Sequence, residues 1–148
     1  MTDLVVRAER TFGCSPSLVW TTVGDLTRLS TWFPIHQVGD MTTAAPAVGN
    51  VVYVSFRRRV DPARAVRLEV CEWNAGESYV LAMSGLDGVS EARLAVRVAG
   101  LPQERLATVT LRLSGDVEPR RRWLIARIAR RRFAEALRRL EKAAPCPP

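Results

Sequence analysis

Hydrophobic and polar residues alternate along much of the first 118 residues, the pattern of strands that bury one face. The clearest runs lie at 92–98 and 107–113, where Ala, Leu and Val alternate with Arg and Thr. Such strands are typical of an antiparallel sheet. Further strands are predicted at 4–12, 51–59, 66–73 and 79–83, with a weak strand and turn at 39–49. Turns are predicted at 61–62, 74–76, 85–88 and 101–105.

Two short helical segments are expected after the first strand. Ser15 is a good N-cap and Pro16 suits the first helical position, so a helix should begin there. Gly24-Asp25 interrupts it. A second helical piece then runs towards Trp32 and ends at Pro34, since the residue before a proline is disfavoured in a helix.

The longest helical pattern runs from about Pro119 to Ala143. Pro119 is well placed to open it. Trp123 lies at the border of its apolar stripe, where the indole can stack on Arg127 or Arg130. A sheet with one apolar face needs a cover, and only this helix is long enough. The apolar side carries Ile125, Ala126, Ala129, Phe133, Ala136, Leu137 and Leu140, opposite Arg127, Arg131, Arg138 and Lys142.

The segment SPSLVWTTVGDLTRLSTWFP after the first strand, followed by PAVGNVVYV, resembles the START, Bet v 1 and polyketide cyclase (SRPBCC) superfamily. The resemblance implies an α+β helix-grip fold. In that fold, two short helices follow the first strand, and a curved antiparallel sheet of about six or seven strands wraps a long C-terminal helix. It also implies an apolar cavity between sheet and helix. We expect one domain over residues 1–144 and a disordered tail at 145–148.

The 148-residue length fits a single domain that needs neither disulfide nor metal to fold. No apolar run approaches the roughly 20 residues of a membrane span, so we expect no stable membrane insertion. The chain starts Met-Thr-Asp and lacks the basic and apolar regions of a signal peptide. These features predict a cytoplasmic protein.

Cysteine and histidine are scarce. The cysteines are Cys14, Cys71 and Cys146, without a CxxC pair, and His36 is the single histidine. A zinc site is therefore not expected. No Gly-rich phosphate loop, GxSxG elbow or HExxH motif is present, and we expect no cofactor.

The net charge of +7 is concentrated in one segment. Residues 119–148 carry ten basic and two acidic residues, whereas residues 1–118 carry twelve basic and thirteen acidic residues. A basic helix with a bordering Trp is one pattern of an interaction module on a membrane surface or nucleic acid. The apolar side of this helix is needed by the sheet, and no nucleic-acid-binding motif is present. Nucleic acid is therefore not an expected partner.

Alternation also indicates which strand residues point inward. Val52, Val54 and Phe56 form a better inward set than Tyr53, Ser55 and Arg57, which are assigned to the outer face. Trp32 and Phe33 either gate a cavity mouth or close the helices onto the sheet. The predicted ligand-binding residues are Trp32, Phe33, Val54, Phe56, Leu68, Val70, Leu81, Met83, Ala129, Phe133 and Ala136.

Two residues are candidates for proton transfer. His36 has the one side chain that titrates near neutrality and follows Trp32 and Phe33. It is either a general base for cyclisation or dehydration or a solvated loop histidine. Tyr79 either orients or protonates a ligand or packs in the core.

The leading hypothesis is a protein that binds a small, largely hydrophobic molecule, such as a polyketide or lipid, between sheet and helix. The alternative is an enzyme, a polyketide cyclase or dehydratase that acts in the same cavity during biosynthesis. An interaction module based on the Arg-rich helix is a third possibility. The sequence leaves open whether the protein is a monomer or a homodimer.

Overall fold

The computed structural model describes residues 2–38, 47–56, 65–100 and 106–145. The strands are β1 (Thr2–Phe12), β2 (His36–Val38), β3 (Val51–Ser55), β4 (Val66–Asn74), β5 (Ser78–Ser84), β6 (Val89–Ala99) and β7 (Ala107–Val117). The helices are α1 (Pro16–Val23), α2 (Leu29–Trp32) and α3 (Arg122–Ala143), with a 3-10 turn η1 at Leu26–Arg28.

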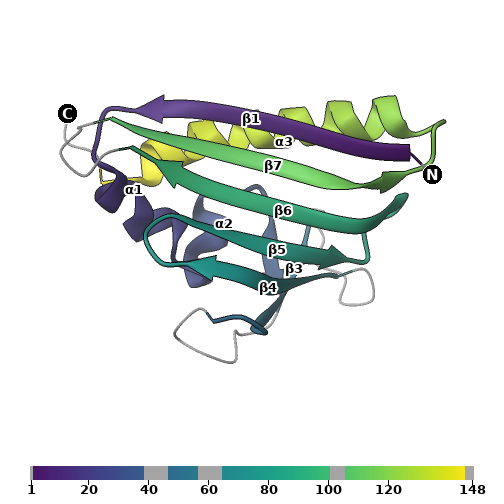
Figure 1. Ribbon diagram of the computed structural model, residues 1–148, viewed down its shortest axis with the longest axis horizontal. Helices are drawn as coiled ribbons and strands as arrows, with labels where there is room; N and C mark the ends of the chain where they lie inside the picture. Colours follow the sequence, from purple (N-terminus) through teal and green to yellow (C-terminus); the bar gives the residue numbers. More distant parts are fainter. Residues whose placement is uncertain (1, 39–46, 57–64, 101–105, 146–148) are drawn as a thin grey trace.

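One antiparallel sheet contains all seven of these strands, in the order β1-β7-β6-β5-β4-β3-β2. β1 and β7 pair along their whole length, from Thr2 with Val117 to Phe12 with Ala107. Figure 1 shows α3 lying along one face of the sheet, with α1 and α2 near its C-terminal end. This architecture confirms the predicted helix-grip fold.

The core lies between the sheet and α3, as the two periodicities predict. Along β7 the residues at alternate positions from Ala107 to Leu113 are buried, because successive side chains of a strand point to opposite faces. The outward-facing residues of α3, including Arg127, Arg131 and Arg138, are exposed. The buried residues of α3 are Ala126, Ala129, Phe133, Ala136, Leu137 and Leu140.

The C-terminal end of α3 is also fastened at the edge of the sheet. Arg10 of β1 forms an ion pair with Glu141 of α3. Both side chains are partly exposed, so the pair contributes little stability but fixes a contact between strand and helix. At the other end of α3, the guanidinium of Arg127 lies 5.4 Å from the centroid of the Trp123 ring. This confirms one of the two predicted stacking partners.

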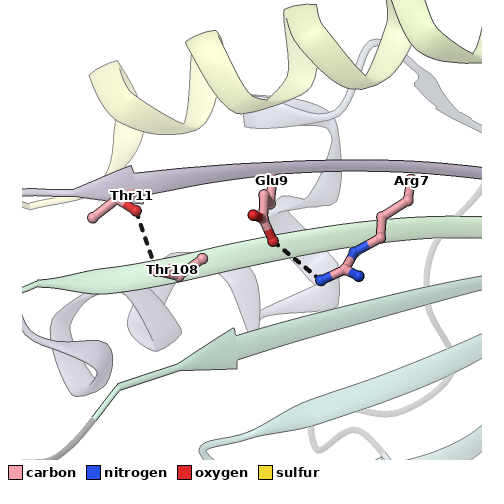
Figure 2. A network of polar contacts seen from close by, with 4 residues as sticks. All are labelled: Arg7, Glu9, Thr11 and Thr108. Atoms are coloured by element: carbon pink, nitrogen blue, oxygen red, sulfur yellow. Dashed lines mark hydrogen bonds and ion pairs between the residues drawn. The ribbon is translucent and has the colours of Figure 1, made fainter.

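The outer face of the sheet is polar. Figure 2 shows Arg7 and Glu9 of β1 in an ion pair at 3.1 Å, and a hydrogen bond of 3.2 Å between the hydroxyl groups of Thr11 and Thr108. Thr11 and Thr108 are directly opposite in the register of β1 and β7. Such cross-strand pairs help hold the register of a solvated face.

Two local features differ from the expectations. The three-residue β2 was not predicted, since it is too short for an alternating pattern. Pro119 lies in the turn that precedes α3, and the helix begins three residues later, at Arg122. Parts of the predictions for 39–49, 51–59, 61–62, 101–105 and the 145–148 tail lie outside the described residues.

Across the described part of the chain, no helix combines the length and hydropathy needed to cross a membrane.

The break at Gly24 leaves space for a tryptophan. Gly24 is the C-cap of α1, at φ −81°, so its backbone does not require glycine. A Cβ built there would lie 2.4 Å from Cε2 of Trp20, one turn earlier. The Trp20 ring also packs against Trp73, with centroids 5.5 Å apart. Gly24 is therefore needed for space rather than for backbone freedom.

We expect Gly24→Ala to lower the free energy of unfolding by about 1–3 kcal/mol, because the methyl group overpacks the Trp20 contact. Urea denaturation followed by circular dichroism measures the change. Gly13→Ala is the matched control, because a Cβ at Gly13 has no neighbour within 4 Å. Equal stability of the two variants would contradict this explanation.

Candidate functional site

A cavity of about 650 Å³ lies between the sheet and the N-terminal half of α3. Its volume falls in the range of small-molecule sites, about 300–1,000 Å³. Most of the residues that line it are apolar. The residues that line it are Phe33, Ser55, Phe56, Ala65, Val66, Met83, Gly85, Leu86, Asp87, Val89, Leu94, Leu113, Ile125, Ile128, Ala129, Arg132 and Phe133.

The floor of the cavity comes from inward-facing residues at one end of the sheet. Val66 opens β4, Met83 lies near the end of β5, and Leu94 and Leu113 belong to β6 and β7. Leu94 pairs directly with Leu113, whereas Val66 lies two residues before Leu68, the partner of Met83, and Met83 pairs with Ala92, two residues before Leu94. The sheet thus supplies a continuous aliphatic surface.

The roof of the cavity comes from α3. Ile128 and Ala129 follow Ile125 by three and four residues on the helix, so both lie on its side. The small side chain of Ala129 leaves room beneath the helix. Phe133 closes the space farther along α3, where its ring meets Phe33 edge-on at 6.2 Å between centroids.

The connection between β5 and β6 forms one rim of the cavity. Gly85 and Gly88 both have positive φ, +98° and +77°, which favours glycine at both ends of this turn. A Cβ at Gly88 would lie 3.4 Å from Ile125 Cδ1, so the turn packs closely on the start of α3. Asp87 in the turn and Ile128 on the helix are exposed. The cavity therefore reaches the surface between this turn and α3.

Three polar side chains belong to the described lining: Ser55, Asp87 and Arg132. Ser55 is buried, in contrast to the predicted outer-face position. It is the last residue of β3, where the alternation of the strand ends, so both Ser55 and the following Phe56 reach the cavity.

Arg132 is the positive charge of the cavity. Its Nη1 and Nη2 donate to the backbone oxygens of Pro34 and Phe56, each at 3.3 Å. Its Cζ lies 5.1 Å from the centroid of the Phe56 ring. Burial lowers the pKa of Arg132, and the nearby carboxylate of Glu135 opposes the shift. An arginine nevertheless remains charged in a protein.

Five of the predicted ligand-binding residues line the cavity: Phe33, Phe56, Met83, Ala129 and Phe133. The other six are buried in the core and are not part of the lining, namely Trp32, Val54, Leu68, Val70, Leu81 and Ala136. All six belong to the main hydrophobic core of the described residues. Alternation identifies an inward face but not the part of that face that remains uncovered. Ligand contact stays a prediction for all eleven.

His36 lies in β2, opposite Ser55 of β3. Its side chain is exposed and is not part of the cavity lining. The structure therefore places this histidine on an edge strand of the sheet, exposed to solvent, and its catalytic role stays a prediction.

Tyr79 is fully buried, and its hydroxyl donates to the backbone oxygen of Val23 at 2.8 Å. Val23 is the last residue of α1, whose carbonyl has no partner within the helix. The Tyr79 ring stacks on Trp73 at 5.2 Å and meets Trp20 edge-on at 6.0 Å. Tyr79 lies outside the described cavity lining, so these contacts favour the core-packing interpretation.

Sequence reasoning missed Arg132, although a signal was present. Arg132 follows Ile125 by seven residues and precedes Ala136 by four, so it lies on the apolar side of the helix. An arginine at core spacing is unusual, because arginine is almost never fully buried unless it is paired. Among so many arginines in one helix, this position was not distinguished from the exposed ones.

The described residues include no group of three or more His, Cys, Asp and Glu side chains arranged to hold a metal ion.

The amino-acid sequence matches the profile of a known family. The profile described as "Polyketide cyclase / dehydrase and lipid transport" matches residues 3–145, nearly the whole chain. The protein belongs to this family. The resemblance seen in the sequence is thereby confirmed. The family and its fold support a protein that binds hydrophobic ligands. A comparison with curated proteins found no match.

Solved structures share the family fold at low sequence identity. A solution NMR structure from Thermobifida fusca has a TM-score of 0.74 and 21% identity, covering 93% of this chain and 90% of that one. XoxI from Bacillus cereus has a TM-score of 0.74 and 14% identity, covering 97% and 96%. Truncated norcoclaurine synthase from Thalictrum flavum has 0.70 and 13%, covering 96% and 93%. These likenesses show the fold alone.

We expect Tyr79→Phe to lower the free energy of unfolding by about 1 kcal/mol, because the Val23 carbonyl loses its donor. Burial raises the pKa of Tyr79 above its ordinary value of 10.0, so the wild type keeps its full stability below about pH 10 and loses stability as the pH rises further and the unfolded tyrosine ionises. The variant should therefore also show a shallower loss of stability in alkali. Urea denaturation at neutral pH and at about pH 11 measures both effects.

Tyr53→Phe is the matched control, since Tyr53 is the other tyrosine of the chain and is 47% exposed. It should change neither the stability nor its alkaline slope. If Tyr53→Phe had the same effect as Tyr79→Phe, the buried hydrogen bond would not be the cause.

Proposed function

We propose that the protein binds a small, largely hydrophobic molecule in the cavity between the sheet and α3. The observation that supports this proposal is the cavity itself, with its volume of about 650 Å³ and its mostly apolar lining residues. Burial of an apolar ligand surface contributes about 25 cal/mol per Å² removed from water. An apolar cavity of this volume can therefore supply affinity without a metal or cofactor.

The mouth of the cavity supports the same proposal. Ile128 is 45% exposed although it borders the cavity, and Leu86 lies in the facing turn. Apolar side chains at an opening suit an apolar molecule, because its transfer from water to apolar surroundings is favourable. The family description also includes lipid transport.

A structural neighbour gives a second line of support. Norcoclaurine synthase from Thalictrum flavum was solved in complex with dopamine and hydroxybenzaldehyde, which are small aromatic molecules. It shares 15% identity with this chain, so the ligands themselves are not transferred. The comparison indicates the scale of molecule that this fold holds.

The enzyme alternative, a polyketide cyclase or dehydratase, is favoured by the family description and by the polar groups in the wall. Arg132 is suited to polarise a carbonyl oxygen, and Asp87 at the rim is suited to accept a proton. His36 would need a different route to the ligand, because its side chain lies outside the lining.

Native mass spectrometry of the freshly purified protein tests the binding function directly. We expect a bound molecule of a few hundred daltons, the size that such a cavity holds. Denaturing extraction then identifies it, and incubation with fresh protein separates the two functions. An unchanged molecule supports a binding protein, whereas a converted molecule supports the enzyme.

A cavity-filling variant tests the location. N-phenyl-1-naphthylamine, a neutral fluorescent probe, should bind the wild-type protein and fluoresce in the apolar cavity. Ala129→Phe should reduce its affinity at least about tenfold, because the new ring occupies the space under α3. Fluorescence titration measures the dissociation constant.

Ala134→Phe is the control, since Ala134 is exposed on the same helix. It should bind the probe as the wild type does. Equal binding by the wild type and Ala129→Phe, with both folded, would exclude the cavity as the binding site.

A further inference from the structure

Arg132 is a fixed positive charge in a wall of apolar side chains. It is half-buried and lies among Phe56, Ile128, Ala129 and Phe133. Withdrawing a charge from water costs free energy unless other groups replace the lost solvation. The lowered pKa of Arg132, caused first by burial, is a sign of this cost. The charge of Arg132 therefore needs polar groups that replace its lost solvation.

The contacts within the protein compensate the charge only in part. The two hydrogen bonds, to the backbone oxygens of Pro34 and Phe56, are both 3.3 Å long, beyond the usual N–H···O range. A guanidinium has five N–H donors, so the donors that these two bonds do not use remain available for further hydrogen bonds. The Phe56 ring covers one face of the guanidinium, which leaves its edge as the direction for further hydrogen bonds.

No carboxylate in the described parts of the chain lies within ion-pair distance of Arg132. Glu135, one turn along α3, is paired with Arg139 at 2.7 Å. Asp87 is exposed at the rim, where solvent screens its charge. Within the described residues Arg132 therefore has no ion-pair partner, and the Glu135 carboxylate acts on it only from beyond ion-pair distance.

We propose that the bound molecule is an amphipathic acid whose carboxylate pairs with Arg132. The guanidinium fork matches a carboxylate in geometry and charge, and such charge-assisted pairs are among the strongest hydrogen bonds in proteins. The apolar body of the ligand then lies against Val66, Met83, Leu94 and Leu113 on the floor of the cavity. This inference rests on the proposed binding function and names the chemical class of its ligand.

A purely structural role for Arg132 makes a different prediction. The same two hydrogen bonds fasten α3 to the segments that contain Pro34 and Phe56. If fastening were the whole role, loss of Arg132 would weaken the binding of neutral and acidic ligands alike. An anchoring role instead changes the preference between them. The ratio of two affinities in one variant therefore separates the roles, even where the variant is less stable.

The experiment compares dodecanoate with 1-dodecanol as competitors of N-phenyl-1-naphthylamine at neutral pH. The two molecules have the same alkyl chain and differ in the anionic head group. The wild type should bind dodecanoate at least about tenfold more tightly, as expected for a charge-assisted pair. In Arg132→Gln the preference should fall to about twofold or less, while 1-dodecanol still competes.

Arg131→Gln is the control. Arg131 is the exposed neighbour of Arg132 on α3, and its replacement by Gln removes the same charge. It should keep the preference of the wild type. Arg132→Lys should keep part of it, because a lysine retains the charge but lacks the fork. Both comparisons are made after circular dichroism shows that the variants are folded.

The outcomes distinguish this inference from the proposed function. If the probe and 1-dodecanol bind but dodecanoate binds no better, the acid anchor is wrong and the binding function stands. The same holds if Arg132→Gln keeps the preference. If neither the probe nor either twelve-carbon molecule binds the wild type, the proposed function fails and the inference with it.

Discussion

The structure depends on one helix that must cover one face of a seven-stranded sheet. An antiparallel sheet with a single apolar face is stable only when that face is removed from water. Here α3 is the long helix of the described chain, and it lies along β1 and β7 rather than over the centre of the sheet (Figure 1). A single helix is narrower than a sheet of this size, so part of the face needs another cover.

The rest of the sheet face is covered differently at the two ends of α3. Near its C-terminal end, α1 and α2 fill the remaining space, and Trp20, Trp73 and Tyr79 pack together there. Near its N-terminal end, the turn between β5 and β6 approaches the helix at Gly88 and Ile125, and the space beneath stays open. The same helix therefore closes a core at one end and roofs a cavity at the other.

This difference explains how far the sequence could predict the site. Alternation in the strands and the 3.6-residue period of α3 identified the inward faces, because burial on one side leaves a direct trace in the pattern. Val54 and Leu81 were correctly assigned to the inward face, yet they lie in the packed part. Which inward residues border open space depends on how α1 and α2 sit on the sheet. That arrangement is a tertiary property, and no local pattern records it.

The polar candidate residues show the same limit of what can be predicted from the sequence. His36 and Tyr79 were chosen for their chemistry, and the structure places the first on an exposed strand edge and the second under α1. Arg132 was passed over because its residue type is common on this helix. Chemistry alone does not select a functional side chain; a polar group becomes informative when its position would otherwise be apolar. Arg132 meets this condition, since retaining a charge there costs solvation that an aliphatic side chain would not lose. A ligand that restores the lost hydrogen bonds would explain why an arginine occupies this position, which packing alone does not explain.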